Sequence, residues 1–136
     1  MRWVSCNSTF LVKQGLRPSH VLLDIACGSL RAGRLLIPYL APGNYLGIDK
    51  HSEVIEAGKA NEIEAGVLKA QRPEFVDCFS FEKFSKRPDF CIAQSLFSHL
   101  DKRDIELCFL GNWRLLLGPV ANSSPVSLKC LLPFRN

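Results

Sequence analysis

The stretch that most constrains the fold of this chain runs from His20 to Gly33, HVLLDIACGSLRAG. The apolar run Val21–Leu23 is typical of a buried strand, and it leads through Asp24 into the small-residue turn Ala26–Ser29, after which a helical pattern begins. A strand, a tight turn and a helix in this order leave backbone N–H groups and the positive end of a helix dipole facing whatever lies above the turn. Gly28 has no Cβ, so it can adopt a positive φ and let a ligand approach the backbone. The pattern predicts either a ligand-binding turn or an ordinary corner of an α/β fold.

A second acid follows at a spacing that favours the ligand-binding interpretation. Asp49 closes the short strand predicted over Asn44–Asp49 and lies 21 residues beyond Gly28 (49 − 28 = 21). In a βαβ unit this spacing brings a carboxylate to the end of the neighbouring strand, where it can accept both hydroxyls of a ribose. The alternative is that Asp49 caps the helix that begins near Ser52.

These segments resemble the first two motifs of the class I S-adenosylmethionine-dependent methyltransferases, in VLLDIACGSLRAGRLLIPYL and YLGIDKHSEVIEAG. The later stretch PDFCIAQSLFSHL resembles the fourth strand of that family and the helix start after it, and the resemblance extends from about Gly15 to Gly118. It implies an α/β fold, a three-layer Rossmann-like parallel sheet with helices on both faces, and S-adenosylmethionine as cofactor. An acid before the turn, here Asp24, is typical of these methyltransferases, which disfavours a nicotinamide oxidoreductase.

The resemblance also implies roles for individual residues at the cofactor. Asp24 would face the methionine end, directly or through water, and Asp49 would hold the ribose beside Lys50. Asp77 and Cys78, near the end of the third predicted strand, would recognise the adenine, although the segment 79–81 could hold that position instead. The full set of expected cofactor-binding residues is Asp24, Ala26, Cys27, Gly28, Ser29, Asp49, Lys50, Asp77, Cys78 and Gln94.

Gln94 and His99 lie where a substrate pocket would open beyond the fourth strand. His99 is the candidate catalytic residue, because an imidazole can act as a general base on a hydroxyl or amine near neutral pH. The alternative for His99 is a surface or capping residue at a helix start.

Two positions depart from the family pattern D-x-G-x-G-x-G, because Ala26 and Leu30 replace glycines. Leu30 also suits the family members with a D-I-G-C-G-S-L-R-G-G-R core, which have leucine at this position. Ala26 adds a methyl group where the backbone should pass close to the ligand, and a positive φ at this position would make that methyl group unfavourable. Ala26 is therefore expected to weaken cofactor binding.

The length of 136 residues predicts a single domain. The resemblance implies its division into a lead-in helix over 1–19, a cofactor-binding core over 20–118 and an atypical tail over 119–136. An apolar share of 47% with 22% charged residues suits a folded core. The net charge is +4, and the lysines and arginines are scattered along the sequence, so no nucleic-acid patch is indicated. No apolar run approaches the ~20 residues of a membrane helix. We expect a small-molecule substrate as partner, and an exposed sheet edge would allow homo-oligomers to form.

Six cysteines lie in apolar patterns without a C-x-x-C pair, which favours buried thiols in a cytoplasmic protein. The three histidines share no metal-ligand spacing, so we expect no metal site.

The pattern of helices and strands predicts a sheet of about five strands, fewer than the family has. Besides the strands named above, it predicts helices over Trp3–Gln14, Arg31–Leu40 (kinked at Pro38), Ser52 to a break near Gly66, and Asp101–Leu117, and strands over Glu74–Phe79, Asp89–Gln94 and Val126–Leu132. The predicted function is methyl transfer to an unidentified, small-molecule acceptor. The alternative is a truncated, non-catalytic methyltransferase-like domain that binds cofactor or a protein partner.

Overall fold

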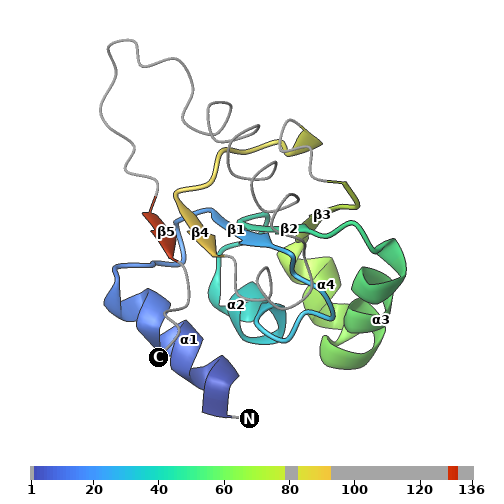
Figure 1. The fold of residues 1–136 in the computed structure, drawn as a ribbon, viewed down its shortest axis with the longest axis horizontal. Coiled ribbons are helices and arrows are strands. Elements are labelled where there is room, and N and C mark those ends of the chain that lie inside the picture. Colours follow the sequence, from blue (N-terminus) through green and yellow to red (C-terminus); the bar gives the residue numbers. More distant parts are fainter. Residues whose placement is uncertain (1, 79–82, 93–128, 132–136) are drawn as a thin grey trace, which may run out of the picture.

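The computed structural model describes residues 2–78, 83–92 and 129–131 (Figure 1). Strands and helices alternate along the first half of the chain, as the sequence predicts for an α/β protein. The elements in chain order are α1 (Arg2–Lys13), β1 (Leu22–Ile25), α2 (Gly33–Tyr39), β2 (Tyr45–Ile48), α3 (Ser52–Glu62), α4 (Ala65–Gln71), β3 (Glu74–Val76), β4 (Phe90–Ile92) and β5 (Lys129–Leu131).

The described strands form one sheet in the order β3-β2-β1-β4-β5, and every neighbouring pair is parallel. From β1 the chain moves outward through β2 to β3, and it then returns to place β4 on the other side of β1. The order therefore reverses between β1 and β4, and ligands in open α/β sheets bind beyond the strand ends at such a reversal.

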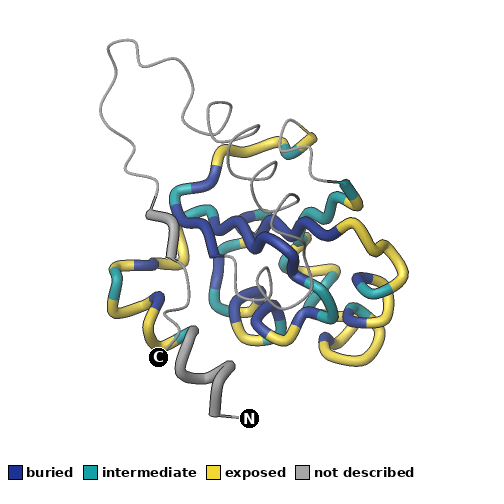
Figure 2. The backbone as a smooth tube through the Cα atoms, in the orientation of Figure 1, coloured by how far each residue is buried: buried dark blue, intermediate teal, exposed yellow. Residues whose placement is uncertain are grey.

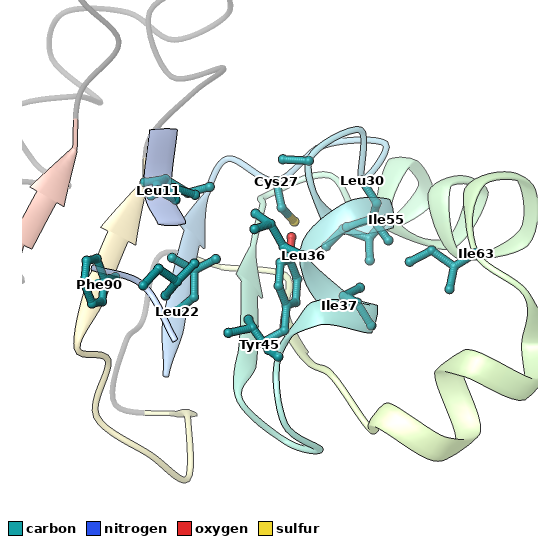
Figure 3. Close-up of a cluster of buried hydrophobic side chains, with 14 residues drawn as sticks. Leu11, Leu22, Cys27, Leu30, Leu36, Ile37, Tyr45, Ile55, Ile63 and Phe90 are labelled. Carbon is teal, nitrogen blue, oxygen red and sulfur yellow. The ribbon is translucent and has the colours of Figure 1, made fainter. Parts of the chain in front are cut away.

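The described helices pack on one face of this sheet, below it in the view of Figure 1. Leu22 and Tyr45 point from the sheet toward Leu36 and Ile37 of α2, and Leu11 brings α1 into the same cluster (Figure 3). Figure 2 shows the burial concentrated in the central strands and in the inward side of the helices. The opposite face of the sheet is also apolar and buried, through Leu23, Ile25, Leu46, Ile48 and Cys91.

The first helix, predicted over Trp3–Gln14, is α1 and ends at Lys13, one residue before the predicted end. Gly15 follows α1 with φ +101° and donates its amide to the Val12 carbonyl at 3.0 Å, while Leu16 donates to Leu11 at 3.0 Å. This pair of bonds is the Schellman arrangement, which needs a left-handed residue and so favours glycine. The stop turns the chain so that Leu16 is buried beside Leu11.

The sequence predicts a helix from Ser52 to a break near Gly66, and the predicted position of this break is wrong. The chain leaves α3 at Ile63, which is extended (φ −131°, ψ 132°), and α4 begins at Ala65, so that Gly66 lies inside a second helix. The extended residue is buried, at 8% exposure, in the core cluster that Val67 and Leu68 of α4 also contact. Packing of these apolar side chains decides the boundary, since tertiary contacts override the weak local propensity of a glycine.

Other elements agree in place but are shorter than predicted. The helix predicted over Arg31–Leu40 is Gly33–Tyr39, with Pro38 inside it, and the strand predicted over Asn44–Asp49 is Tyr45–Ile48. Strand β5 lies within the predicted Val126–Leu132. The helix predicted over Asp101–Leu117 lies outside the described residues. No helix in the described ranges is long and apolar enough to cross a membrane.

Candidate functional site

The turn between β1 and α2 is built from three residues with positive φ: Ala26 (56°), Gly28 (53°) and Leu30 (64°). The Cys27 amide donates to the Ile48 carbonyl at 3.1 Å, which ties the turn to the end of β2, and the Leu30 amide donates to the Cys27 carbonyl at 3.1 Å. The strained conformation suspected for Ala26 is therefore present. Leu30 offsets the same strain by complete burial in the core.

Asp49 lies directly against this turn, as the spacing of 21 residues from Gly28 predicts. Its Oδ2 accepts the Gly28 amide at 3.0 Å, and its Oδ1 accepts the His51 amide at 2.9 Å. The side chain is 9% exposed. A carboxylate oxygen has two lone-pair directions, so each oxygen of Asp49 keeps the capacity to accept one further hydrogen bond.

Asp24 is buried on the face of the sheet that α2 covers. It is 2% exposed, and its Oδ2 accepts a hydrogen bond of 2.6 Å from the Tyr45 hydroxyl. Burial raises the pKa of the Asp24 carboxyl to about 7; the Tyr45 hydrogen bond lowers the pKa, and the negative charge of Asp49 raises it. Burial and the charge of Asp24 likewise raise the pKa of Tyr45. The site thus contains a buried acid that titrates near neutral pH.

Sequence reasoning missed Tyr45, although the sheet register could have indicated it. Asp24 is paired with Gly47, and Tyr45 lies two residues before Gly47, so both side chains point to the same face. Two glycines leave room for the Tyr45 hydroxyl and for the Phe75 ring that lies beside Tyr45. A Cβ at Gly33 would lie 3.0 Å from the Tyr45 hydroxyl oxygen, and one at Gly47 would lie 2.7 Å from Phe75 Cδ1.

Cys27 is a buried thiol in the turn. It is 7% exposed, and a Cβ at Gly47 would lie 3.2 Å from its Sγ. Burial raises the pKa of the Cys27 thiol far above its ordinary value, and the charges of Asp24 and Asp49 raise it further. Because the thiolate is the reactive form, this cysteine is suited to packing rather than to nucleophilic chemistry.

The remaining predicted site residues divide into two groups. Asp77 and Cys78 follow β3 directly, at the same strand ends as Asp49, whose amide donates to the Val76 carbonyl at 3.1 Å. Asp77 and Lys50 are exposed, and Ser29 and Cys78 are half-buried. Gln94, His99 and the alternative adenine segment 79–81 lie outside the described residues. Within the described ranges, no group of three or more His, Cys, Asp or Glu side chains could hold a metal ion.

Comparisons with known proteins connect this geometry to a family of folds. No protein-family model matches the sequence, and no curated protein matches it. Solved structures do match: the glycopeptide N-methyltransferase MtfA superposes with a TM-score of 0.66 at 21% identity, over 95% of this chain and 52% of MtfA. The chain has the class I methyltransferase fold.

Other solved structures with this methyltransferase fold agree. Magnesium protoporphyrin IX methyltransferase (ChlM) from Synechocystis PCC 6803, solved with bound SAH, superposes with a TM-score of 0.63 at 16% identity, over 85% of this chain and 50% of ChlM. PKMT2 from Rickettsia typhi superposes with a TM-score of 0.51 at 21% identity, over 76% of this chain and 20% of PKMT2. The chain thus spans about half the length of MtfA and of ChlM.

Proposed function

We propose that this chain binds S-adenosylmethionine at the Gly28 turn and belongs to a methyltransferase acting on a small-molecule acceptor. The observation that carries the proposal is the Asp49 carboxylate held against the Gly28 amide at 3.0 Å. Structures with the same fold have been solved with the cofactor or its product, namely MtfA with S-adenosylmethionine and ChlM with SAH.

The turn suits the cofactor on its own geometry. Gly28 has a positive φ and no Cβ, so its backbone stays open to close approach beside the Asp49 carboxylate. Both oxygens of Asp49 already accept backbone amides, which fixes their orientation, and each keeps one acceptor direction for a ribose hydroxyl. We assign Asp49 and Lys50 to the ribose, Asp24 to the methionine end, the turn residues Ala26, Cys27 and Ser29 to the cofactor backbone contacts, and Asp77 and Cys78 to the adenine.

S-adenosylmethionine supplies an electrophilic methyl group on a sulfonium. The protein then has to orient the cofactor and the acceptor and to exclude water, since methyl transfer is an in-line displacement. Among the described residues, the rigid turn and the oriented carboxylate of Asp49 perform the orienting task. Gln94 as a cofactor-binding residue at the opening of the substrate pocket and His99 as general base remain predictions from the sequence.

A second candidate function is a methyltransferase-like domain that binds cofactor weakly or not at all and serves as an interaction module. The positive φ of Ala26, 56°, favours it, because the Ala26 methyl group lies at a turn position where the family has glycine.

Isothermal titration calorimetry of the full chain with S-adenosylmethionine, S-adenosylhomocysteine and NAD tests the proposal. We expect binding of the first two ligands only. Replacing Asp49 with Ala should weaken S-adenosylmethionine binding about 10- to 100-fold, because hydrogen bonds to a charged group contribute about 1.5–3 kcal/mol.

Asp89→Ala is the matched control. Asp89 Oδ2 also accepts a backbone amide, that of Val21 at 2.9 Å, but both residues precede their strands, at the opposite end of the sheet. This variant should bind the cofactor as the wild type does. Binding by Asp49→Ala within twofold of wild type would refute the ribose assignment. No binding by a folded wild-type chain would favour the interaction module.

A further inference from the structure

Tyr45 and Asp24 form a buried acid–phenol pair for which the fold provides no counter-ion in the described part of the chain. The hydrogen bond of 2.6 Å joins a carboxyl that is 2% exposed to a tyrosine that is also 2% exposed. The ion pairs found among the described side chains involve other residues, Arg34 with Glu62, His51 with Glu53 and Lys59 with Glu56.

In the part of the chain that the structure describes, few charged and titratable groups surround the pair. On the sheet, Asp24 faces Tyr45 of β2, and Cys27 and Asp49 approach it from the ends of β1 and β2. The register partners of Asp24 are Gly47 and Ile92, which carry no charge. The charged residue of α2, Arg34, contacts Glu62 of α3, and Lys59 of α3 lies over the Phe75 ring at 4.7 Å. Among the described residues, Asp24 therefore has a second acid, Asp49, close to it and no ion pair with a positive side chain.

We infer that Tyr45 is a positioning residue whose hydrogen bond to Asp24 sets the pH at which this chain binds a cationic cofactor. The inference rests on the proposed function, because S-adenosylmethionine carries the cation. A buried carboxyl is ionised with difficulty, and a nearby positive ligand favours the ionised form. Binding and proton release are then linked, so the affinity rises with pH until Asp24 is ionised in the free protein.

The direction of the effect of Tyr45 follows from its hydrogen bond. The phenol donates to the carboxylate and thus lowers the pKa of Asp24, in opposition to burial. Tyr45→Phe removes the hydroxyl that opposes the effects of burial and of the Asp49 charge. The Asp24 carboxyl should therefore titrate at a pH roughly one unit or more higher than in the wild type. The aromatic ring and its packing against Phe75, with ring centroids 6.0 Å apart, remain in this variant.

The test combines a ligand-free titration with pH-dependent binding of S-adenosylmethionine. Carbon-13 NMR of the carboxyl groups should show Asp24 titrating near neutral pH in the wild type and at a higher pH in Tyr45→Phe. By calorimetry, Tyr45→Phe should bind S-adenosylmethionine roughly fivefold more weakly than wild type at pH 7 and about equally at pH 9. Asp24→Asn, which keeps an acceptor for the phenol, should lose the proton release, measured in buffers of different ionisation enthalpy.

Tyr39→Phe is the matched control, because the Tyr39 hydroxyl donates to the Leu16 carbonyl at 2.9 Å and not to an acid. It should leave the pH profile of binding unchanged. Binding by Tyr45→Phe that is weaker by the same factor at every pH would show a merely structural role and overturn the inference, while the proposed function would stand. No binding by the folded wild type would overturn the proposed function, and an unshifted Asp24 titration in Tyr45→Phe would then overturn the role of Tyr45 separately.

Discussion

Gly58 of α3 lies directly against the backbone of Ser29 in the glycine turn. A Cβ at Gly58 would be 2.6 Å from both the carbonyl carbon and the carbonyl oxygen of Ser29 and 3.0 Å from Leu30 Cγ. Backbone atoms cannot rotate away as a flexible side chain can. The contact therefore makes the helix after β2 a direct support of the turn after β1.

Gly58→Ala should destabilise the protein by about 1–3 kcal/mol, because overpacking against a rigid neighbour outweighs the better helix propensity of alanine. Urea unfolding followed by circular dichroism would measure the free energy of unfolding. Gly66→Ala is the control, because Gly66 lies inside α4 with open space around its Cβ position. This variant should have a free energy of unfolding about 0.5–1 kcal/mol higher than the wild type. Equal effects at both positions would contradict the close packing.

Ala26→Gly should stabilise the fold by up to about 1 kcal/mol. A non-glycine residue at positive φ costs about 1–2 kcal/mol, while loss of a buried methyl group costs about 0.8 kcal/mol. We expect S-adenosylmethionine binding to tighten as well, since the turn backbone becomes more open. Ala57→Gly, at an exposed position in α3, should instead destabilise the fold by about 0.5–1 kcal/mol. A loss at Ala26 as large as at Ala57 would rule out strain there.

Stability should fall as the pH rises from about 4 to 7. The pKa of Asp24 is raised from its ordinary value of 3.8 to about 7, so the unfolded chain releases this proton before the folded chain does. The free energy of unfolding therefore decreases in this window, by at most about 1.4 kcal/mol per pH unit, and levels off above pH ~8.

Asp24→Asn should remove this slope, and urea titrations at several pH values would measure it. The same substitution at the exposed Asp77 should leave the slope as it is in the wild type. A wild-type slope that persists in Asp24→Asn would assign the pH dependence to another group.

Cys27 should resist alkylation in the folded protein. Its thiol is buried and its pKa is raised, so the reactive thiolate is scarce, whereas Cys78 is only half-buried. Iodoacetamide labelling at pH 8 with peptide mass mapping should modify Cys27 at least roughly tenfold more slowly than Cys78. In urea the two rates should converge. Comparable rates in the folded chain would show that the turn opens readily.

The β1–turn–α2–β2 unit was predictable from local patterns. Three local features predicted Asp49 beside Gly28: an apolar run, a small-residue turn and the spacing of 21 residues. In the structure, Asp49 Oδ2 lies 3.0 Å from the Gly28 amide nitrogen. The boundary between α3 and α4 was not predictable in this way. The break at Ile63 depends on how that side chain reaches the core, and helix periodicity does not include this contact.

By itself, the sequence determined the strand, the turn with its acid and the helix that follows, because apolar periodicity and the conformational demands of short turns act between near neighbours. The parallel sheet was implied by the resemblance to the class I methyltransferases. The tertiary structure alone decided the chemistry of Asp24. Its pairing with Tyr45 requires two strands to meet in one register, with Asp24 opposite Gly47 and both side chains on the face that α2 covers. Burial of a carboxyl depends on everything packed around it, so the raised pKa belongs to the assembled fold.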